Sequence, residues 1–232
     1  EGVDQGAGNP HNESGPDTAY FWKEVLAKDS ILQLIERFIF LKVDRDKKSK
    51  KTLIFPRYQQ RRAVNRVLED MKVNHTDSNY LIQHSAGSGK TNTIAWLAHS
   101  LVSLHDHEDR NVVDAVLIVT DRIVVDRQLQ DAVQAIQHQP GVIKVMDEKA
   151  TSSDLADALA GNTKIIATTI HKFAQINKSD WMTAGPTAQK RFAILIDEAH
   201  SSTTGSYMGA VGLVFSVTDF LDGTMVEVQE VS

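Results

Sequence analysis

The sequence contains no cysteine among its 232 residues. Disulfide bonds, thiolate chemistry and cysteine-ligated zinc are therefore excluded, and a cytoplasmic location is expected. Long apolar runs are missing as well: no stretch approaches the ~20 apolar residues of a membrane span, and no signal peptide is visible. Because residue 1 is Glu1 rather than Met, we expect the chain to be a piece of a longer protein.

Positive charge is also scarce. Lys and Arg number 25 against 30 Asp and Glu, which gives a formal net charge of −5. A nucleic-acid partner is not indicated by this balance, so any such contact would depend on a local basic patch or on backbone donors. The hydrophobic share of 41% is ordinary for a globular protein, and the length suits one large domain, or one domain with a flank.

Expected strands and helices alternate through most of residues 52–200. Apolar runs at 112–119, 165–167 and 192–196 are typical of strands that are buried on both faces, and amphipathic segments separate them. This order predicts an α/β fold with a mostly parallel central sheet, flanked by helices. Ligands of such sheets bind at the carboxyl ends of the strands.

The first 50 residues differ in pattern from the rest. Residues 1–17 are rich in Gly, Asn, Asp and Pro and are expected to form a linker. Apolar residues then recur at helical spacing in two segments, the second of which could be capped by Asp29 or Ser30. We therefore expect a linker and short helical flank over 1–50 and the main domain over 51–232.

The segment His84–Thr91, His-Ser-Ala-Gly-Ser-Gly-Lys-Thr, joins an expected strand to an expected helix. That is the context of a phosphate-binding loop. Gly87 and Gly89 allow close backbone approach, and the N–H groups at a helix N-terminus attract anions. Lys90 would reach the β- and γ-phosphates, and the Thr91 hydroxyl would ligate Mg²⁺.

This loop departs from the general pattern at one position. The pattern G-x-x-x-x-G-K-[ST] has Gly where this chain has His84. The alternative interpretation is a glycine-rich turn that is followed by Lys and Thr by chance.

An acidic pair, Asp197-Glu198, follows the last apolar run. Nucleotide hydrolysis needs an acid that holds Mg²⁺, a role that suits Asp197. It also needs a group that orients water, which suits Glu198 as general base. Such a pair alone is often a helix N-cap, but a phosphate loop in the expected topology favours the catalytic role.

Two local predictions concern other segments. His105 and His107 bracket Asp106 in a polar connector, which we expect to be solvated rather than a metal site. Ser153 is expected to cap a helix that stops at Gly161.

The phosphate loop and the Asp-Glu-Ala-His box resemble motifs I and II of superfamily 2 helicases and translocases. Residues 55–60, 81–90, 119–122, 168–173 and 197–202 are similar to the motor part of type I restriction enzyme R subunits. Residues 8–24 resemble the segment between nuclease and motor, so the resemblance covers roughly residues 8–204.

The resemblance implies the first RecA-like motor domain of such an enzyme. It implies ATP and Mg²⁺ as cofactors, and ATP-dependent translocation along duplex DNA before the DNA is cleaved. The expected partners are duplex DNA, bound through its backbone without regard to sequence, and the methyltransferase and specificity subunits of a restriction complex. No membrane partner is expected.

The resemblance also assigns roles to individual residues. Adenine would be read by Gln60, with Gln59 as the alternative. The remaining assignments are nucleotide binding for Ala86, Gly87, Ser88, Gly89, Lys90 and Thr91, catalysis for Lys90, Asp197 and Glu198, magnesium binding for Thr91 and Asp197, and contacts with DNA phosphates for Thr120, Arg122, Thr168 and Thr169. Ordinary capping at strand ends is the alternative for the threonines.

Several parts of the family pattern are absent from the sequence. We find no Asp/Glu-x-Lys nuclease set, no Thr-Gly-Thr or Ser-Ala-Thr after the Asp-Glu box, and no second motor domain with its arginine. DNA cleavage is therefore expected of the parent protein, and the isolated chain is expected to hydrolyse little ATP. The alternatives are another superfamily 2 helicase or remodeller, and a catalytically silent docking fragment.

Overall fold

The structure is a computed structural model in which contacts cluster into two units, Glu1–Arg62 and Ala63–Ser232. It describes residues 11–43, 51–74, 79–85, 87–120, 125, 127–136, 141–174, 190–197 and, for their backbone alone, 224–231.

The first unit contains helical turns and a small hairpin. Two five-residue turns, η1 (Phe21–Val25) and η2 (Leu34–Phe38), are wound wider than an α-helix, and α1 (Lys28–Gln33) lies between them. The expected helical flank is confirmed in kind, but Ala27 rather than Asp29 or Ser30 precedes α1, and it makes no side-chain cap.

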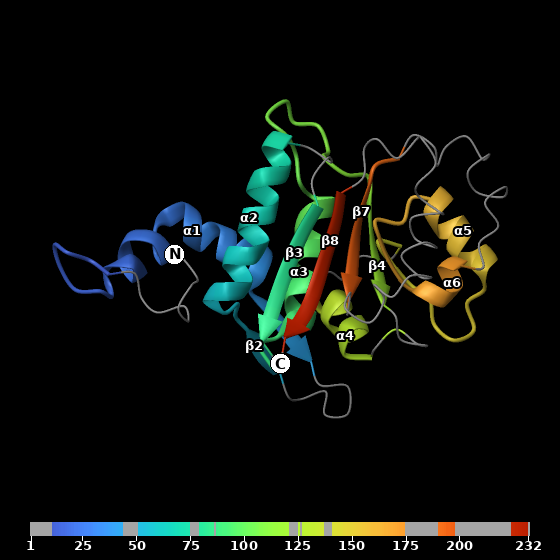
Figure 1. Ribbon diagram of the computed structural model, residues 1–232, viewed down its shortest axis with the longest axis horizontal. Coiled ribbons are helices and arrows are strands. Elements are labelled where there is room, and N and C mark those ends of the chain that lie inside the picture. Colours follow the sequence, from blue (N-terminus) through green and yellow to red (C-terminus); the bar gives the residue numbers. More distant parts are fainter. Residues whose placement is uncertain are drawn as a thin grey trace. The chain divides into compact units, whose positions relative to one another are not determined.

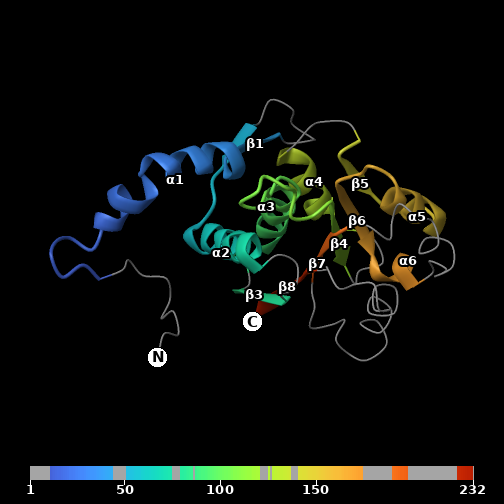
Figure 2. The same cartoon turned by 90° about the horizontal axis from the view of Figure 1, so that it is seen from above.

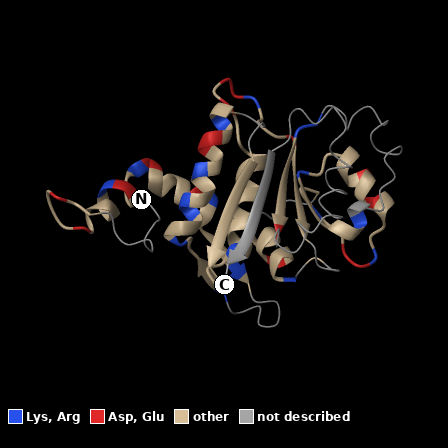
Figure 3. Ribbon diagram, in the orientation of Figure 1, with Lys and Arg blue, Asp and Glu red and all other residues tan. Residues whose placement is uncertain are grey.

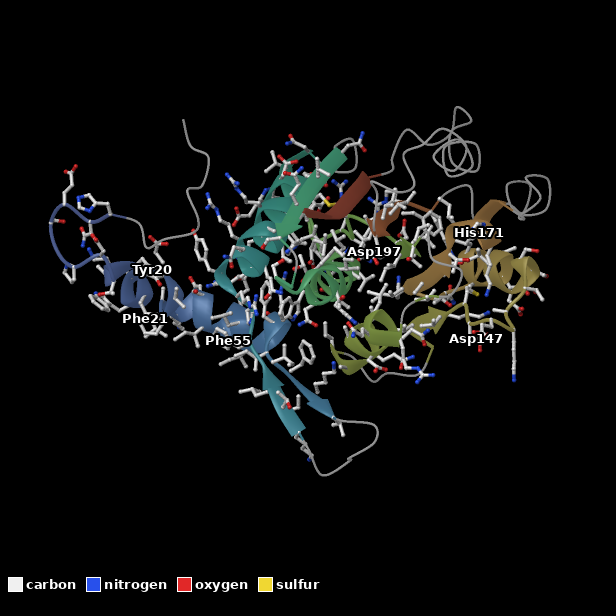
Figure 4. The ribbon with its side chains drawn as sticks, turned by 60° about the horizontal axis from the view of Figure 1, so that its bottom comes forward. Tyr20, Phe21, Phe55, Asp147, His171 and Asp197 are labelled. Carbon is white, nitrogen blue, oxygen red and sulfur yellow. The ribbon has the colours of Figure 1, made fainter. Side chains whose placement is uncertain are left out.

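The hairpin was not predicted from the sequence. Strands β1 (Phe40–Val43) and β2 (Lys51–Ile54) pair antiparallel, with Phe40 opposite Ile54 and Val43 opposite Lys51. Leu34, Phe38 and Phe40 are buried, whereas Phe21 and Phe55, labelled in Figure 4, are about half exposed.

Helix α2 (Tyr58–Asn74) begins at the end of the first unit. There the Arg61 guanidinium donates to Ser30 Oγ at 2.7 Å and to Gln33 Oε1 at 3.0 Å. Burial lowers the pKa of Arg61 from its ordinary value. In the second unit, α2 buries Val64, Val67, Leu68 and Met71, which recur at helical spacing along one side of the helix.

The second unit is built on a sheet in which every described strand pair is parallel. Its strands lie in the order β3, β8, β7, β4, β6, β5 (Figure 1). Their bounds are β3 (Asn79–Ser85), β4 (Ala115–Thr120), β5 (Ile143–Val145), β6 (Ile165–Thr169), β7 (Phe192–Asp197) and β8 (Thr224–Val231). The predicted α/β class is confirmed.

Helices cover both faces of this sheet (Figure 2). One face carries α3 (Lys90–Val102) and α4 (Arg127–Ile136), and the other carries α5 (Ser152–Ala160) and α6 (Ile170–Ala174). Every residue of β4, β6 and β7 is consequently buried, as their continuous apolar runs indicate. Helices α3 and α4 are tied by a 2.7 Å hydrogen bond between His99 Nε2 and the Val133 carbonyl.

Helix α5 is capped at both ends by its own surroundings. Its N-cap is Thr151, not the expected Ser153: the Thr151 hydroxyl accepts from the Asp154 N–H at 3.2 Å, and Asp154 Oδ2 accepts from the Thr151 N–H at 2.7 Å. Thr151 takes this place because its extended backbone aims the hydroxyl at the first turn. At the other end, Lys190 Nζ donates to the carbonyls of Leu159 and Ala160.

Among the helices of the described residues, none combines the length and the apolar character needed to cross a membrane.

Candidate nucleotide-binding site

The loop after β3 closes in a tight turn. The Ser88 N–H donates to the Ser85 carbonyl at 3.0 Å, and Gly87, the third residue of the turn, has a φ of 69°. Only glycine adopts this φ at little cost. Ala86, assigned to nucleotide binding by sequence, lies outside the described residues.

Helix α3 begins directly after this turn, without a side-chain cap. Its N-cap is Gly89, which has a φ of 90° and no side chain that could bond the first N–H groups. Lys90 and the half-buried Thr91 form the start of the first turn. A Cβ added to Gly87 would meet no atom within 4 Å, so there is open space over the loop. The residues present therefore fit an anionic phosphate group.

The loop lysine lies against the acid at the end of β7. Lys90 Nζ is 3.0 Å from Asp197 Oδ1, and the two side chains are 9% and 10% exposed. Figure 4 shows Asp197 beside α3, at the end of the sheet from which that helix starts. A shielded pair of this kind interacts more strongly than a surface pair. Glu198, the predicted general base, lies outside the described residues.

The threonines assigned to DNA do not share one face of the sheet. Thr120 is the register partner of both Asp197 and Thr169, so these three residues lie in one row on one face. Thr168 pairs with Val119, and alternation of side chains along a strand turns both to the opposite face.

These threonines are also buried. Thr120, Thr168 and Thr169 are 0–1% exposed, and the Thr168 and Thr169 hydroxyls have no hydrogen-bond partner in the part of the chain that the structure describes. The described conformation does not present them to solvent, where a DNA phosphate would lie. Arg122 is outside the described residues, so the DNA contacts stay predictions.

Gln60 occupies the third position of α2, after Arg57 at the N-cap position. Its Oε1 accepts the Arg57 N–H at 2.8 Å, which is half of a capping box. Gln60 is 3% exposed, whereas Gln59 is exposed. Adenine reading by Gln60 stays a prediction, and the capping bond supplies the side chain with a structural role as well.

The polar connector after α3 is organised by Asp106. Its Oδ1 accepts the N–H groups of Glu108 and Arg110, each at 2.9 Å, and its Oδ2 accepts Arg110 Nε at 2.9 Å. These donors, above all the Arg110 N–H, lower the pKa of Asp106 to about 2. These hydrogen bonds make the connector an ordered turn. Among the described residues, no group of three or more His, Cys, Asp and Glu is placed to hold a metal ion.

One contact at the site was missed by the sequence reasoning. His84 Nδ1 lies 2.8 Å from Ser88 Oγ, inside the same loop. The sequence does show a side chain, His84, at a position where the general pattern has glycine, but it does not show which residue that side chain contacts.

The fold and this site define a class of protein. A parallel sheet whose strand-end loop opens a helix with Lys-Thr, and whose neighbouring strand end supplies an acid, is a nucleotide-binding motor domain of the RecA-like kind.

Comparison with known proteins gives the family. Residues 59–225 match the SWI2/SNF2 ATPase family, and the chain belongs to it. The chain is 26% identical, over 228 residues, to a protein of Methanocaldococcus jannaschii named as the type I restriction enzyme MjaVIIIP endonuclease subunit. The alignment covers 86% of this chain but only 21% of that protein, so the chain spans about a fifth of its relative.

One solved structure supports the fold, and a second is reported beside it. The yeast DEAD-box splicing factor Prp28 matches with a TM-score of 0.55 and 13% identity, over 89% of this chain and 45% of that one. The helicase domain of Pyrococcus furiosus Hef has a TM-score of 0.49 and 16% identity, over 75% of this chain and 32% of that one. The expected resemblance to superfamily 2 motors and to type I restriction subunits is confirmed, and the chain is an ATP-dependent, helicase-like motor domain.

Proposed function

We propose that this chain is the ATP-binding motor domain of the R subunit of a type I restriction enzyme, in which it drives translocation along duplex DNA before cleavage. The observation that carries the proposal is the 3.0 Å contact between Lys90 and Asp197, where the phosphate loop meets the end of β7. The name of the Methanocaldococcus jannaschii relative points to a type I restriction system. The methyltransferase and specificity subunits that the sequence resemblance implies are the proposed partners.

In this proposal, the described side chains divide the work at the phosphates. Lys90 exchanges its contact with Asp197 for the β- and γ-phosphates, and the backbone N–H groups of Gly87 and Gly89 are directed to the phosphates. Asp197 and the Thr91 hydroxyl are the residues that would hold Mg²⁺, and the ion would neutralise charge on the phosphate oxygens. Glu198 orients the attacking water, and Gln60 reads adenine.

We propose that DNA is bound by residues close to the carboxyl ends of the strands, among them Arg122, which follows β4. The net charge of −5 on these 232 residues disfavours a general attraction of DNA to the chain, and Figure 3 shows acidic and basic residues interspersed over the described helices. Contacts should therefore be local and should weaken with salt. Arg122 is the candidate that would lower the salt slope by about one unit when neutralised.

The isolated chain should hydrolyse almost no ATP. Phosphoryl transfer needs positive charge on the developing γ-phosphate oxygens, and an arginine finger is worth ~10³–10⁵ in rate. The resemblance assigns that arginine to a second motor domain. Arg61 of this chain could be considered for the same role, but its guanidinium already donates to Ser30 and Gln33.

The experiment that tests this function uses the full-length protein. Phosphate release should be stimulated by duplex DNA without sequence preference, and Glu198→Gln should slow it by ~10²-fold or more while ATP still binds. Displacement of a third DNA strand from a duplex would report translocation. Turnover of Glu198→Gln at the parent rate, or turnover indifferent to DNA, would contradict the proposal.

The family match favours one second candidate, a SWI2/SNF2-type motor outside restriction. The two candidates are separated by purification. The restriction proposal predicts that the full-length protein assembles with a methyltransferase and a specificity subunit, and the second candidate predicts that it does not.

A further inference from the structure

His84 lies at the point where β3 turns into the phosphate loop. It is 5% exposed although it stands next to a surface turn. The general phosphate-loop pattern has glycine here, with no side chain at all. A buried imidazole at this position is therefore a departure from the general pattern.

The alternation of β3 explains why the ring is buried. Ile82 and His84 are buried, while Leu81 and Gln83 are exposed, because successive side chains of a strand point to opposite faces. Tyr80, on the same face as His84, bonds Asp70 of α2 through its hydroxyl at 2.5 Å. The ring of His84 is thus on the face of β3 that also carries the bond from Tyr80 to α2.

From that position the ring reaches the loop that follows it. His84 Nδ1 is 2.8 Å from Ser88 Oγ, a normal hydrogen-bond length. The Ser88 N–H is bonded to the Ser85 carbonyl at 3.0 Å. Ser88 is therefore held by its side chain and by its backbone, between two glycines that restrict the chain little by themselves.

We infer that His84 is a positioning residue, which holds the phosphate loop in its binding conformation through the Ser88 hydroxyl. This inference rests on the proposed function, since it assumes that the loop receives phosphate. The hydrogen bond from the ring restricts the conformation of the loop, which the two glycines alone leave unrestricted. The loop then meets the nucleotide already in its binding conformation, so less ordering of the loop accompanies binding.

Replacing a residue that positions the loop changes nucleotide binding, whereas replacing a residue that stabilises the fold changes the free energy of unfolding. Loss of the bond leaves the sheet and α3 intact, because the loop is at the surface. The ordering that His84 supplies must then occur when nucleotide binds, so the loss is seen in nucleotide affinity and in KM for ATP, with kcat little changed.

The test is a double-mutant cycle on the full-length protein, with fluorescent ATP and Mg²⁺ as the probe. His84→Leu and Ser88→Ala should each weaken binding about three- to tenfold. The double variant should bind no more weakly than the weaker single variant, because both changes remove one bond. His84→Asn, which keeps a polar atom near Nδ1, should recover most of the affinity.

Three controls make each outcome decisive. Gln83→Ala, an exposed neighbour on the other face, should bind like the parent, and thermal unfolding without nucleotide should be similar for all variants. Additive losses, no loss in Ser88→Ala, or no recovery in His84→Asn would overturn the inference. Lys90→Ala separates the two proposals: if it binds as tightly as the parent, the proposed function fails, and if it binds weakly while the cycle is additive, only the role of His84 fails.

Discussion

Helices α3 and α5 each follow a strand of the same sheet and a connecting loop, yet their N-termini differ in capping. Helix α5 satisfies its own first turn through Thr151 and Asp154. Helix α3 starts after Gly89, with no side-chain cap. The first N–H groups of a helix need partners, and a helix that does not supply them from its own side chains can offer them to a ligand.

The two helices differ in the same way in their use of lysine. Lys190 bonds the last carbonyls of α5 and completes that helix. Lys90, the first residue of α3, instead contacts Asp197, whose proposed role requires Mg²⁺. The difference teaches that a helix start capped by its own side chains is a structural feature, while a helix start without a side-chain cap, whose first lysine faces an acid, is a candidate site.

We expect the largest effect from replacing Gly89, the glycine at the start of α3. Gly89→Ala forces alanine to a φ of 90°, a strain of about 1–2 kcal/mol. We expect nucleotide affinity to fall about tenfold, measured by titration with fluorescent ATP, because the loop relaxes away from its conformation.

Gly141 provides the matched control for that variant. Its φ is 83°, and a Cβ there would meet nothing within 4 Å. Gly141→Ala should therefore lose similar stability but no nucleotide affinity. Equal losses of affinity in both variants would show that the effect of Gly89→Ala is general destabilisation.

The cap of α5 should have a smaller effect, and on stability alone. Thr151→Ala removes the hydroxyl that accepts the Asp154 N–H and should cost about 1 kcal/mol in the free energy of unfolding. Urea denaturation measures this cost, with Ser152→Ala as the neutral neighbour. If Thr151→Ala altered nucleotide affinity, the division between structural and ligand-binding helix ends would be wrong.

Acid should weaken the same cap. Bonds from the Thr151 N–H and hydroxyl hold the pKa of Asp154 below its usual value. A depressed folded-state pKa contributes stability above the unfolded-state pKa, and that stability is lost as pH falls through the folded-state pKa. The stability difference between the parent and Asp154→Asn, followed by urea denaturation, should therefore shrink below about pH 4. A difference that is constant with pH would contradict this account.

Much of the fold could be predicted because its strands are local and strongly patterned. Runs such as 112–119 and 192–196 appear as β4 and β7, with bounds shifted by a few residues at most. The place of β8 between β3 and β7 could not be predicted, because alternating residues indicate a strand but not its neighbours. Hairpin β1–β2 was missed because a charged run separates its two short strands.

The site was predictable where a motif fixes both residue type and position. The loop and Asp197 were predicted in this way, and the structure brings Lys90 and Asp197 together, while their roles toward a nucleotide stay predictions. Side-chain direction was harder to predict. Adjacent residues of a strand point to opposite faces, so Thr168 and Thr169 do not share a face of the sheet, and both are buried.

The central claim is that the contact between Lys90 and Asp197 marks a nucleotide site, and calorimetric titration with ATP and Mg²⁺ tests it most directly. Lys90→Ala removes a charge-assisted contact worth roughly 1.5–3 kcal/mol, so its affinity should fall at least about tenfold. Lys190→Ala, which removes a lysine that caps α5, should bind ATP like the parent. If Lys90→Ala, still folded by circular dichroism, bound ATP as tightly as the parent, this strand end would not be the nucleotide site.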